Sequence, residues 1–240
     1  MQPTTPSSLL PTPLSGEDFC LIFDLDGTLV DSEGLCNQAL LDVAPRLNES
    51  LESVTRRYRG RRFLWIENDL RARLTAAGHE LPEHFEQRYR QRVSDLFDRE
   101  LKPMPGVLDM LEACRLPYCI ASSGPMAKIR HALKISGLDR YFGDRIYSAY
   151  DVQVWKPDPG LFLHAANAMG FAADRCIVIE DSDVGVQAAV AAGMKVFQYL
   201  PLPEHAPSTG SIVFDDMSKL LALVGLEVDQ RQSAQQLTNP

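Results

Sequence analysis

The sequence predicts an α/β fold with a doubly wound parallel sheet and a helical segment inserted after the first strand. Apolar segments of strand length alternate with segments of helix length over residues 103–226, which is typical of βαβ units and a sheet covered on both faces. Residues 34–102 contain no strand-like run and place apolar residues at helical spacing. We therefore expect a discontinuous core domain, 17–33 and 103–226, interrupted by a helical domain, 34–102.

The first strand leads directly into two carboxylates, Asp24 and Asp26. Its unbroken apolar run, Cys-Leu-Ile-Phe, is typical of the buried centre of a parallel sheet, and ligands bind beyond the carboxyl ends of such strands. Two like charges this close need a cation or a shared proton, so we expect the chemistry here. A plain polar turn is the alternative. A calcium loop is excluded, because Leu35 stands where its last ligand would be.

The inserted segment is predicted to be helical because its apolar residues recur every three to four positions. One stripe is Phe63, Ile66, Leu70 and Leu74, and a second is Phe85, Tyr89, Val93, Leu96 and Leu101. Gly78 separates two of the helices. Pro103, Pro105 and Gly106 end the segment, because helices do not tolerate this combination.

The remaining elements follow in alternation. We expect helices at 107–114, 127–136, 161–169 and 184–192 and a last one through Leu223, strands at 118–122, 176–179, 196–200 and 211–214, and a short β-rich piece at 145–150. Gly137, Gly170 and Gly193 stop three of these helices. Residues 1–16, rich in Pro, Ser and Thr, and the polar residues 227–240 are expected to be loose tails.

Composition excludes several classes of protein. The 240 residues are 45% apolar and 23% charged, as in ordinary globular proteins, and no apolar run reaches the ~20 residues of a membrane helix. The net charge of −8 argues against nucleic acid or an anionic membrane as the partner, although residues 51–102 are more basic than the rest. The five scattered cysteines indicate neither a disulfide framework nor zinc. We expect a cytoplasmic monomer without nucleic-acid or membrane partners.

Three later segments carry polar groups that suit a phosphate site. They are Ser122-Ser123-Gly124, Trp155-Lys156-Pro157-Asp158-Pro159 and Glu180-Asp181-Ser182. The first offers hydroxyl and backbone N–H groups at a helix entrance, the prolines of the second hold its lysine in place, and the acids of the third are costly at the end of a buried strand without a cation. Each also has a plainer explanation: a common turn, a free surface lysine, or helix capping by Ser182 or Asp183.

Taken together, these segments resemble the haloacid dehalogenase superfamily of phosphotransferases. Its four signatures appear in order as Asp24-Leu25-Asp26-Gly27-Thr28, Ser122, Lys156 before Pro157, and Glu180-Asp181. The helical insert resembles the C1 cap of the β-phosphoglucomutase-like subfamily. Within it, Asp31-Ser32-Glu33 and the segment around Lys156 are similar to bacterial 6-phosphogluconate phosphatase-like proteins.

The resemblance implies a phosphatase that depends on Mg²⁺ and forms an aspartyl-phosphate. Asp24 would be the nucleophile and Asp26 the general acid and base. Mg²⁺ would be held by the Asp24 carboxylate, the main-chain carbonyl of Asp26 and Asp181, with Glu180 beside or behind it. Thr28 would hold the turn after Asp26.

The resemblance also implies how the substrate is held. Ser122, Ser123 and Lys156 would bind the phosphoryl oxygens. The segment Arg59-Gly60-Arg61-Arg62 falls where family members carry their specificity loop. Three arginines favour a second anionic group, because a guanidinium binds a carboxylate with two hydrogen bonds. We expect a small phosphorylated metabolite, a sugar acid phosphate such as 6-phosphogluconate; a solvated arginine run is the alternative.

Two other functions remain as alternatives. A sugar-phosphate mutase would use the same scaffold, but β-phosphoglucomutases place a histidine in the first cap helix where this chain has Cys36. A phospho-accepting signalling domain also uses paired acids, a Lys and a Ser or Thr. It is disfavoured because such domains accept phosphate on an Asp after a later strand and have no inserted cap. A dehalogenase is disfavoured because halide displacement has no use for Asp26.

Overall fold

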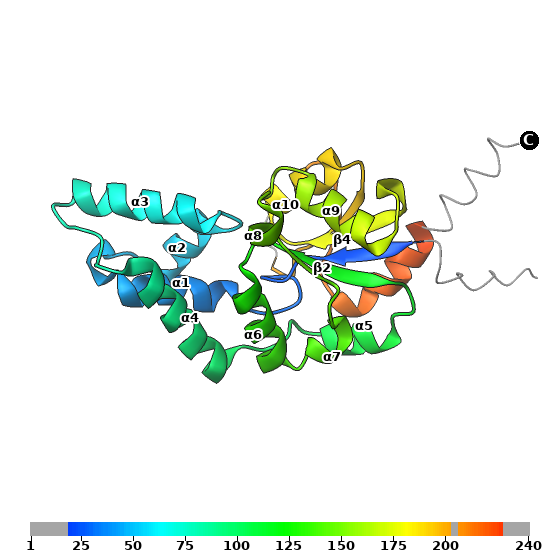
Figure 1. Ribbon diagram of the computed structural model, residues 1–240, viewed down its shortest axis with the longest axis horizontal. Coiled ribbons are helices and arrows are strands. Elements are labelled where there is room, and N and C mark those ends of the chain that lie inside the picture. Colours follow the sequence, from blue (N-terminus) through cyan, green and yellow to red (C-terminus); the bar gives the residue numbers. More distant parts are fainter. Residues whose placement is uncertain (1–18, 203–205, 228–240) are drawn as a thin grey trace, which may run out of the picture.

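A six-stranded parallel sheet forms the centre of the computed structural model, which describes residues 19–202 and 206–227 (Figure 1). The strands are β1 (Cys20–Phe23), β2 (Tyr118–Ser122), β3 (Ile146–Ser148), β4 (Cys176–Glu180), β5 (Lys195–Tyr199) and β6 (Ile212–Phe214). Their order in the sheet is β3-β2-β1-β4-β5-β6. Strands β2 and β3 are added on one side of β1, and β4, β5 and β6 are added on the other. Ligands bind in open α/β sheets at this switch point, between β1 and β4. The predicted fold class is confirmed. The expected tail 1–16 lies outside the described residues, and so does the expected tail 227–240 apart from Glu227.

Both faces of the sheet are buried. Along β1, Leu21 and Phe23 belong to one apolar cluster and Cys20 and Ile22 to another, because successive side chains of a strand point to opposite faces. The first face is covered by α5 (Val107–Ala113), α6 (Met126–Ser136), α7 (Asp139–Phe142) and the helical residues 220–227, and the second by α9 (Gly160–Met169) and α10 (Asp183–Ala191). Burial on both faces explains why the strands are apolar without alternation.

Helices of the insert lie at the end of the sheet where β1 finishes, to the left in Figure 1. They are α1 (Glu33–Val43), α2 (Leu51–Tyr58), α3 (Phe63–Ala76) and α4 (Phe85–Glu100). Buried Leu40, Val54 and Leu70 belong to an apolar cluster separate from the two on the sheet. The second half of α4, including Val93 and Phe97, instead joins the cluster on the first face. The helix α4 therefore packs against both the other helices of the insert and the core.

The main difference from the predicted elements lies at 145–150. The strand β3 ends at Ser148, and the short helix α8 (Ala149–Val152) begins directly after it. The Ser148 hydroxyl caps this helix by accepting a hydrogen bond from the backbone N–H of Tyr150 at 3.1 Å. Four residues are too few to show helical periodicity, and α7 is equally short. Among the described residues, no helix has both the length and the apolar character needed to cross a membrane.

Candidate functional site

The candidate site lies beyond the carboxyl ends of β1 and β4. Asp24 directly follows β1, and its backbone N–H donates to Ile179 of β4 at 2.9 Å. Glu180 is the last residue of β4, and Asp181 follows it. Because β1 and β4 are neighbours in the sheet, residues that are far apart in the sequence meet here. A pocket between the core and the insert opens onto all three carboxylates.

Lys156 lies between two of these acids. Its Nζ is 2.5 Å from Asp24 Oδ1 and 2.6 Å from Glu180 Oε2, and its side chain is only 3% exposed. Burial alone would lower the pKa of Lys156, but the charges of Asp24 and Glu180 outweigh burial and raise that pKa. The predicted lysine is therefore an ammonium held inside the acidic cluster.

Three buried carboxylates form a group that could hold a metal ion. Asp24, Glu180 and Asp181 each offer an oxygen, and these oxygens lie within 4.8 Å of one another. Burial, with the charge of Glu180, raises the pKa of Asp24 to about 8. Burial, with the charge of Glu33, also raises the pKa of Asp181. An all-oxygen donor set whose members repel one another is the chemistry that a hard divalent cation satisfies.

Two glycines allow the carboxylates to come this close. A Cβ on Gly185, in the first turn of α10, would lie 2.0 Å from the Glu180 carboxylate. Gly27 has a φ of +82°, and a Cβ there would lie 2.7 Å from Asp181 Oδ2. The Ser182 hydroxyl caps α10 by accepting from the Gly185 N–H, and it also donates to Glu180 Oε1 at 2.8 Å. Capping and site formation therefore use the same serine.

Asp26 is held apart from the three-carboxylate group. Its Oδ1 accepts hydrogen bonds from the Ser32 hydroxyl at 2.5 Å and from Lys128 Nζ at 2.7 Å. Although burial favours the neutral acid, Lys128 and Ser32 hold the pKa of Asp26 below its usual range. Lys128 was not among the site residues predicted from the sequence. The available signal was its place in the first turn of the helix that follows Ser123, since that end of the helix faces the site.

The two serines after β2 have different surroundings. Ser122 is 1% exposed, and its hydroxyl accepts a hydrogen bond from the Gly124 N–H at 3.1 Å. Ser123 and Gly124 line the pocket. The Ser148 hydroxyl, at the end of β3, holds the same turn by donating a hydrogen bond to the Gly124 carbonyl at 2.7 Å. Thr28, which was expected only to hold its own turn, donates to Asp181 Oδ1 at 3.3 Å.

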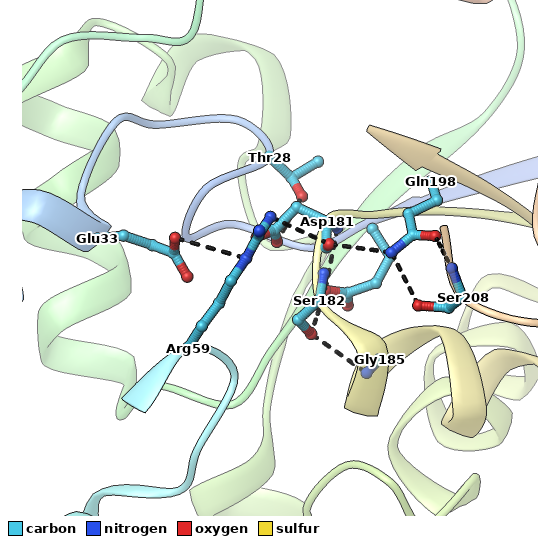
Figure 2. Close-up of polar contacts among 9 residues, drawn as sticks. Thr28, Glu33, Arg59, Asp181, Ser182, Gly185, Gln198 and Ser208 are labelled. Atoms are coloured by element: carbon cyan, nitrogen blue, oxygen red, sulfur yellow. Dashed lines mark hydrogen bonds and ion pairs between the residues drawn. The ribbon is translucent and has the colours of Figure 1, made fainter. Parts of the chain in front are cut away.

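The predicted specificity loop of the insert also reaches the pocket. Figure 2 shows Arg59 between Glu33 and Asp181, with Nη2 3.2 Å from Asp181 Oδ2 and Nε 3.8 Å from Glu33 Oε2. Next to it, Gly60 has a φ of +66°, and a Cβ there would lie 2.9 Å from the Ser182 side chain. The backbone of the insert therefore touches the core at this point.

The other two arginines of the loop stack on tryptophans. The guanidinium of Arg61 lies 4.9 Å from the ring centre of Trp65 in the insert. The guanidinium of Arg62 lies 4.1 Å from the ring centre of Trp155 in the core. Both arginines line the pocket, and Arg62 joins the insert to the loop that carries Lys156.

Comparison with known proteins gives consistent matches. A family model described as a haloacid dehalogenase-like hydrolase matches residues 20–193. The chain is 38% identical over 191 residues to 6-phosphogluconate phosphatase of Escherichia coli (strain K12), covering 78% of this chain and 85% of that protein.

Crystal structures of related proteins share the architecture. A conserved haloacid dehalogenase-like protein of unknown function from Agrobacterium tumefaciens has a TM-score of 0.74 and 29% identity, over 87% of this chain and 98% of that one. A HAD family hydrolase from Deinococcus radiodurans R1, with bound phosphate and sodium, has a TM-score of 0.70 and 28% identity, over 86% of this chain and 95% of that one.

Proposed function

We propose that this chain, which belongs to the haloacid dehalogenase-like hydrolase family and is a phosphatase, is a Mg²⁺-dependent phosphomonoester hydrolase acting through an aspartyl-phosphate. The observation that carries the proposal is the meeting of Asp24, Lys156, Glu180 and Asp181 at the switch point of the sheet. Its substrate is a small phosphorylated metabolite, which we propose to be a sugar acid phosphate such as 6-phosphogluconate.

Asp24 is the proposed nucleophile. A carboxylate oxygen of Asp24 bonds to phosphorus as the bond between phosphorus and the leaving alcohol breaks, and water then displaces Asp24 to release phosphate. Lys156 Nζ, 2.5 Å from Asp24, provides the positive charge that lets an anionic phosphoryl group approach a carboxylate. The same lysine is tied to Glu180, which fixes its position before substrate arrives.

Asp26 is the proposed general acid and base. The pKa of Asp26 is lowered in the free protein, and the negative charge of a bound phosphate raises it, so that the carboxylate takes up a proton when substrate binds. In the first step this proton passes to the leaving oxygen, and in the second Asp26 takes a proton from the attacking water. Proton transfer of this kind contributes roughly 10²–10⁴-fold to a rate. The position of Asp26 supports the assignment, because its side chain faces the pocket and lies outside the three-carboxylate group.

Mg²⁺ fits the carboxylate group by the chemistry of its donors. Asp24 and Asp181 are the proposed carboxylate ligands, with the main-chain carbonyl of Asp26 as a third oxygen. Glu180 has both oxygens engaged, Oε2 by Lys156 and Oε1 by the Ser182 hydroxyl and two backbone N–H groups. We therefore propose that Glu180 acts through a water molecule. When bound, the ion neutralises charge on the phosphoryl oxygens.

Phosphoryl oxygens are proposed to bind around the turn after β2. Ser123 and Gly124 line the pocket, so the backbone N–H and the hydroxyl of Ser123 are available to an anion. Ser122 lies behind this turn and shapes it through its bond to the Gly124 N–H. Lys156, which is bonded to Asp24, supplies positive charge to the same oxygens.

The proposed substrate class rests on the loop arginines. Arg59, Arg61 and Arg62 line the same pocket as Asp24, and a guanidinium binds a carboxylate strongly and with fixed geometry. A sugar acid phosphate offers a carboxylate at the end remote from its phosphate. The 38% identity to a 6-phosphogluconate phosphatase supports this choice of substrate.

Phosphate release from a panel of metabolites tests the proposal. The panel pairs 6-phosphogluconate with glucose 6-phosphate, which differ in the remote acid group, and adds an aryl phosphate. We expect Mg²⁺-dependent release, with a higher kcat/KM for the acid. Full activity after exhaustive chelation would contradict the metal requirement, and equal kcat/KM for the pair would contradict the substrate class.

A further inference from the structure

Two donors from different parts of the protein hold the same oxygen of Asp26. Ser32, which precedes the first helix of the insert, and Lys128, in α6 of the core, both bind Oδ1. Within residues 19–202 and 206–227 the structure places no hydrogen bond on Oδ2. One oxygen of this carboxylate is therefore fixed, whereas the other accepts no hydrogen bond from the described residues, and Asp26 lines the pocket.

Lys128 is built into this position. Its side chain is 23% exposed, and its Nζ lies 5.8 Å from the ring centre of Phe97 in α4. Burial alone would lower the pKa of Lys128, but the charge of Asp26 outweighs burial and raises that pKa. The Lys128 ammonium therefore ties the core helix α6 to Asp26 in the loop after β1.

Two other cations that line the pocket are already paired with acids. Lys156 is bound between Asp24 and Glu180, and Arg59 is bound to Asp181. Lys156 also attracts Asp26 electrostatically. Without Lys128, only the Ser32 hydroxyl would hold the Asp26 carboxylate against this attraction.

We propose that Lys128 is a positioning residue that fixes the Asp26 carboxylate so that Oδ2 carries out both proton transfers, an inference that rests on the proposed function. The Oδ2 proton moves to the leaving oxygen as the bond between phosphorus and that oxygen breaks. A proton from water returns to Oδ2 as the water oxygen bonds to phosphorus. Lys128 keeps its own protons throughout, and its contribution is orientation, on which such transfers depend strongly.

Leaving-group dependence tests this role. The first step depends on the leaving group: alkyl phosphates need a proton on departure and 4-nitrophenyl phosphate does not, so a misplaced Asp26 should slow that step only for the former. For Lys128→Met we expect the single-turnover rate of the first step to fall about 10²-fold on an alkyl phosphate and to change by less than about 3-fold on 4-nitrophenyl phosphate, whereas the loss of base catalysis in the second step lowers kcat on both. Lys128→Arg should restore most of the loss. Lys134→Met, an exposed lysine on the same helix, is the matched control and should change neither rate.

A double-mutant cycle separates orientation from general electrostatics. If Lys128 acts through Asp26, Lys128→Met should cost little more in an Asp26→Asn background, because the shared function is already lost. Additive losses would overturn the proposal. Equal losses of the first-step rate on both kinds of phosphate would do the same, and an increase confined to KM would make Lys128 a substrate-binding group instead.

Different results would refute the proposed function and the role of Lys128. Absence of Mg²⁺-dependent phosphate release by the wild-type protein from any substrate is a failure of the proposed function. Wild-type release together with an unchanged rate for Lys128→Met on alkyl phosphates is a failure of this inference alone. Thermal unfolding shows which variants fold, and Lys128→Gln repeats the measurements if the methionine variant does not.

Discussion

At the scale of single residues, the site is governed by how burial changes the protonation of its acids. Asp24 has its pKa raised to about 8 without a metal, chiefly by burial, whereas a metal ligand must be ionised. At neutral pH the metal-free protein therefore keeps a proton on Asp24 that the same residue would lose in the unfolded chain. A bound cation reverses this preference, because it favours the charged carboxylate.

The raised pKa predicts that Mg²⁺ binding releases protons. Between about pH 6 and pH 8 the ion competes with the proton on Asp24, so its apparent affinity should rise with pH and level off above about 8. Titration calorimetry at pH 7 in two buffers of different ionisation enthalpy measures the protons released. Asp24→Asn is the control and should lose the part of this release that comes from Asp24. Binding heats that are the same in both buffers would contradict the prediction.

At the scale of elements, the loop between α2 and α3 contacts the core beside the candidate site. Gly60→Ala should impair catalysis, because its Cβ would lie 2.9 Å from the side chains of Ser182 and Val184 and push the loop away. We expect kcat/KM to fall by about 10-fold or more, since small displacements in an active site are costly.

Gly78→Ala is a matched control for this change. Gly78 also has a positive φ, +76°, but a Cβ there meets nothing within 4 Å. Both variants should lose about 1 kcal/mol of stability from backbone strain, measured by chemical unfolding, but only Gly60→Ala should lose activity. Equal activities of the two variants would show that loop contact with the core does not matter for catalysis.

The arginines of the same loop predict a change in substrate preference. Arg61→Ala and Arg62→Ala should lower kcat/KM for 6-phosphogluconate by about 10-fold or more and for glucose 6-phosphate by only a few-fold, because one bidentate contact to the carboxylate is lost. Arg71→Ala, an exposed arginine of α3, is the control. A uniform loss on both substrates would leave these arginines as general phosphate attractors.

At the scale of the whole molecule, the pocket between insert and core favours hydrolysis over isomerisation. A mutase must hold its aspartyl-phosphate until a second hydroxyl arrives. At the place of the mutase histidine, Cys36 lines the pocket, and burial raises the pKa of its thiol, so it is a poor acid or base at neutral pH. Among the described residues that line this pocket, none is a histidine.

This difference predicts the products formed from a mutase substrate. With β-glucose 1-phosphate and its bisphosphate activator, free phosphate should appear faster than glucose 6-phosphate, because water wins the second displacement. Following both products in one reaction measures the ratio. Isomerisation that outruns phosphate release would contradict the phosphatase proposal.

The sequence predicted those site residues whose polar side chains stand next to a recognisable strand or loop end. Asp24, Lys156 and Asp181 stand at strand or loop ends, so their meeting follows from strand order in a parallel sheet. Lys128 was harder to predict, because its place in the first turn of α6 indicates only that it lies near the site, whereas its bond to Asp26 depends on how that helix packs against the loop after β1. Likewise, the bond between Thr28 and Asp181 joins residues 153 positions apart.

Trapping the covalent intermediate tests the central claim most directly. A reaction with 6-phosphogluconate and Mg²⁺ is quenched in acid during turnover and reduced with borohydride, which converts an aspartyl-phosphate to homoserine, and peptides are read by mass spectrometry. The account predicts homoserine at position 24 in a substrate-dependent amount, and none in Asp24→Asn. Homoserine at another aspartate, or turnover of 6-phosphogluconate by Asp24→Asn at near the wild-type rate, would contradict it.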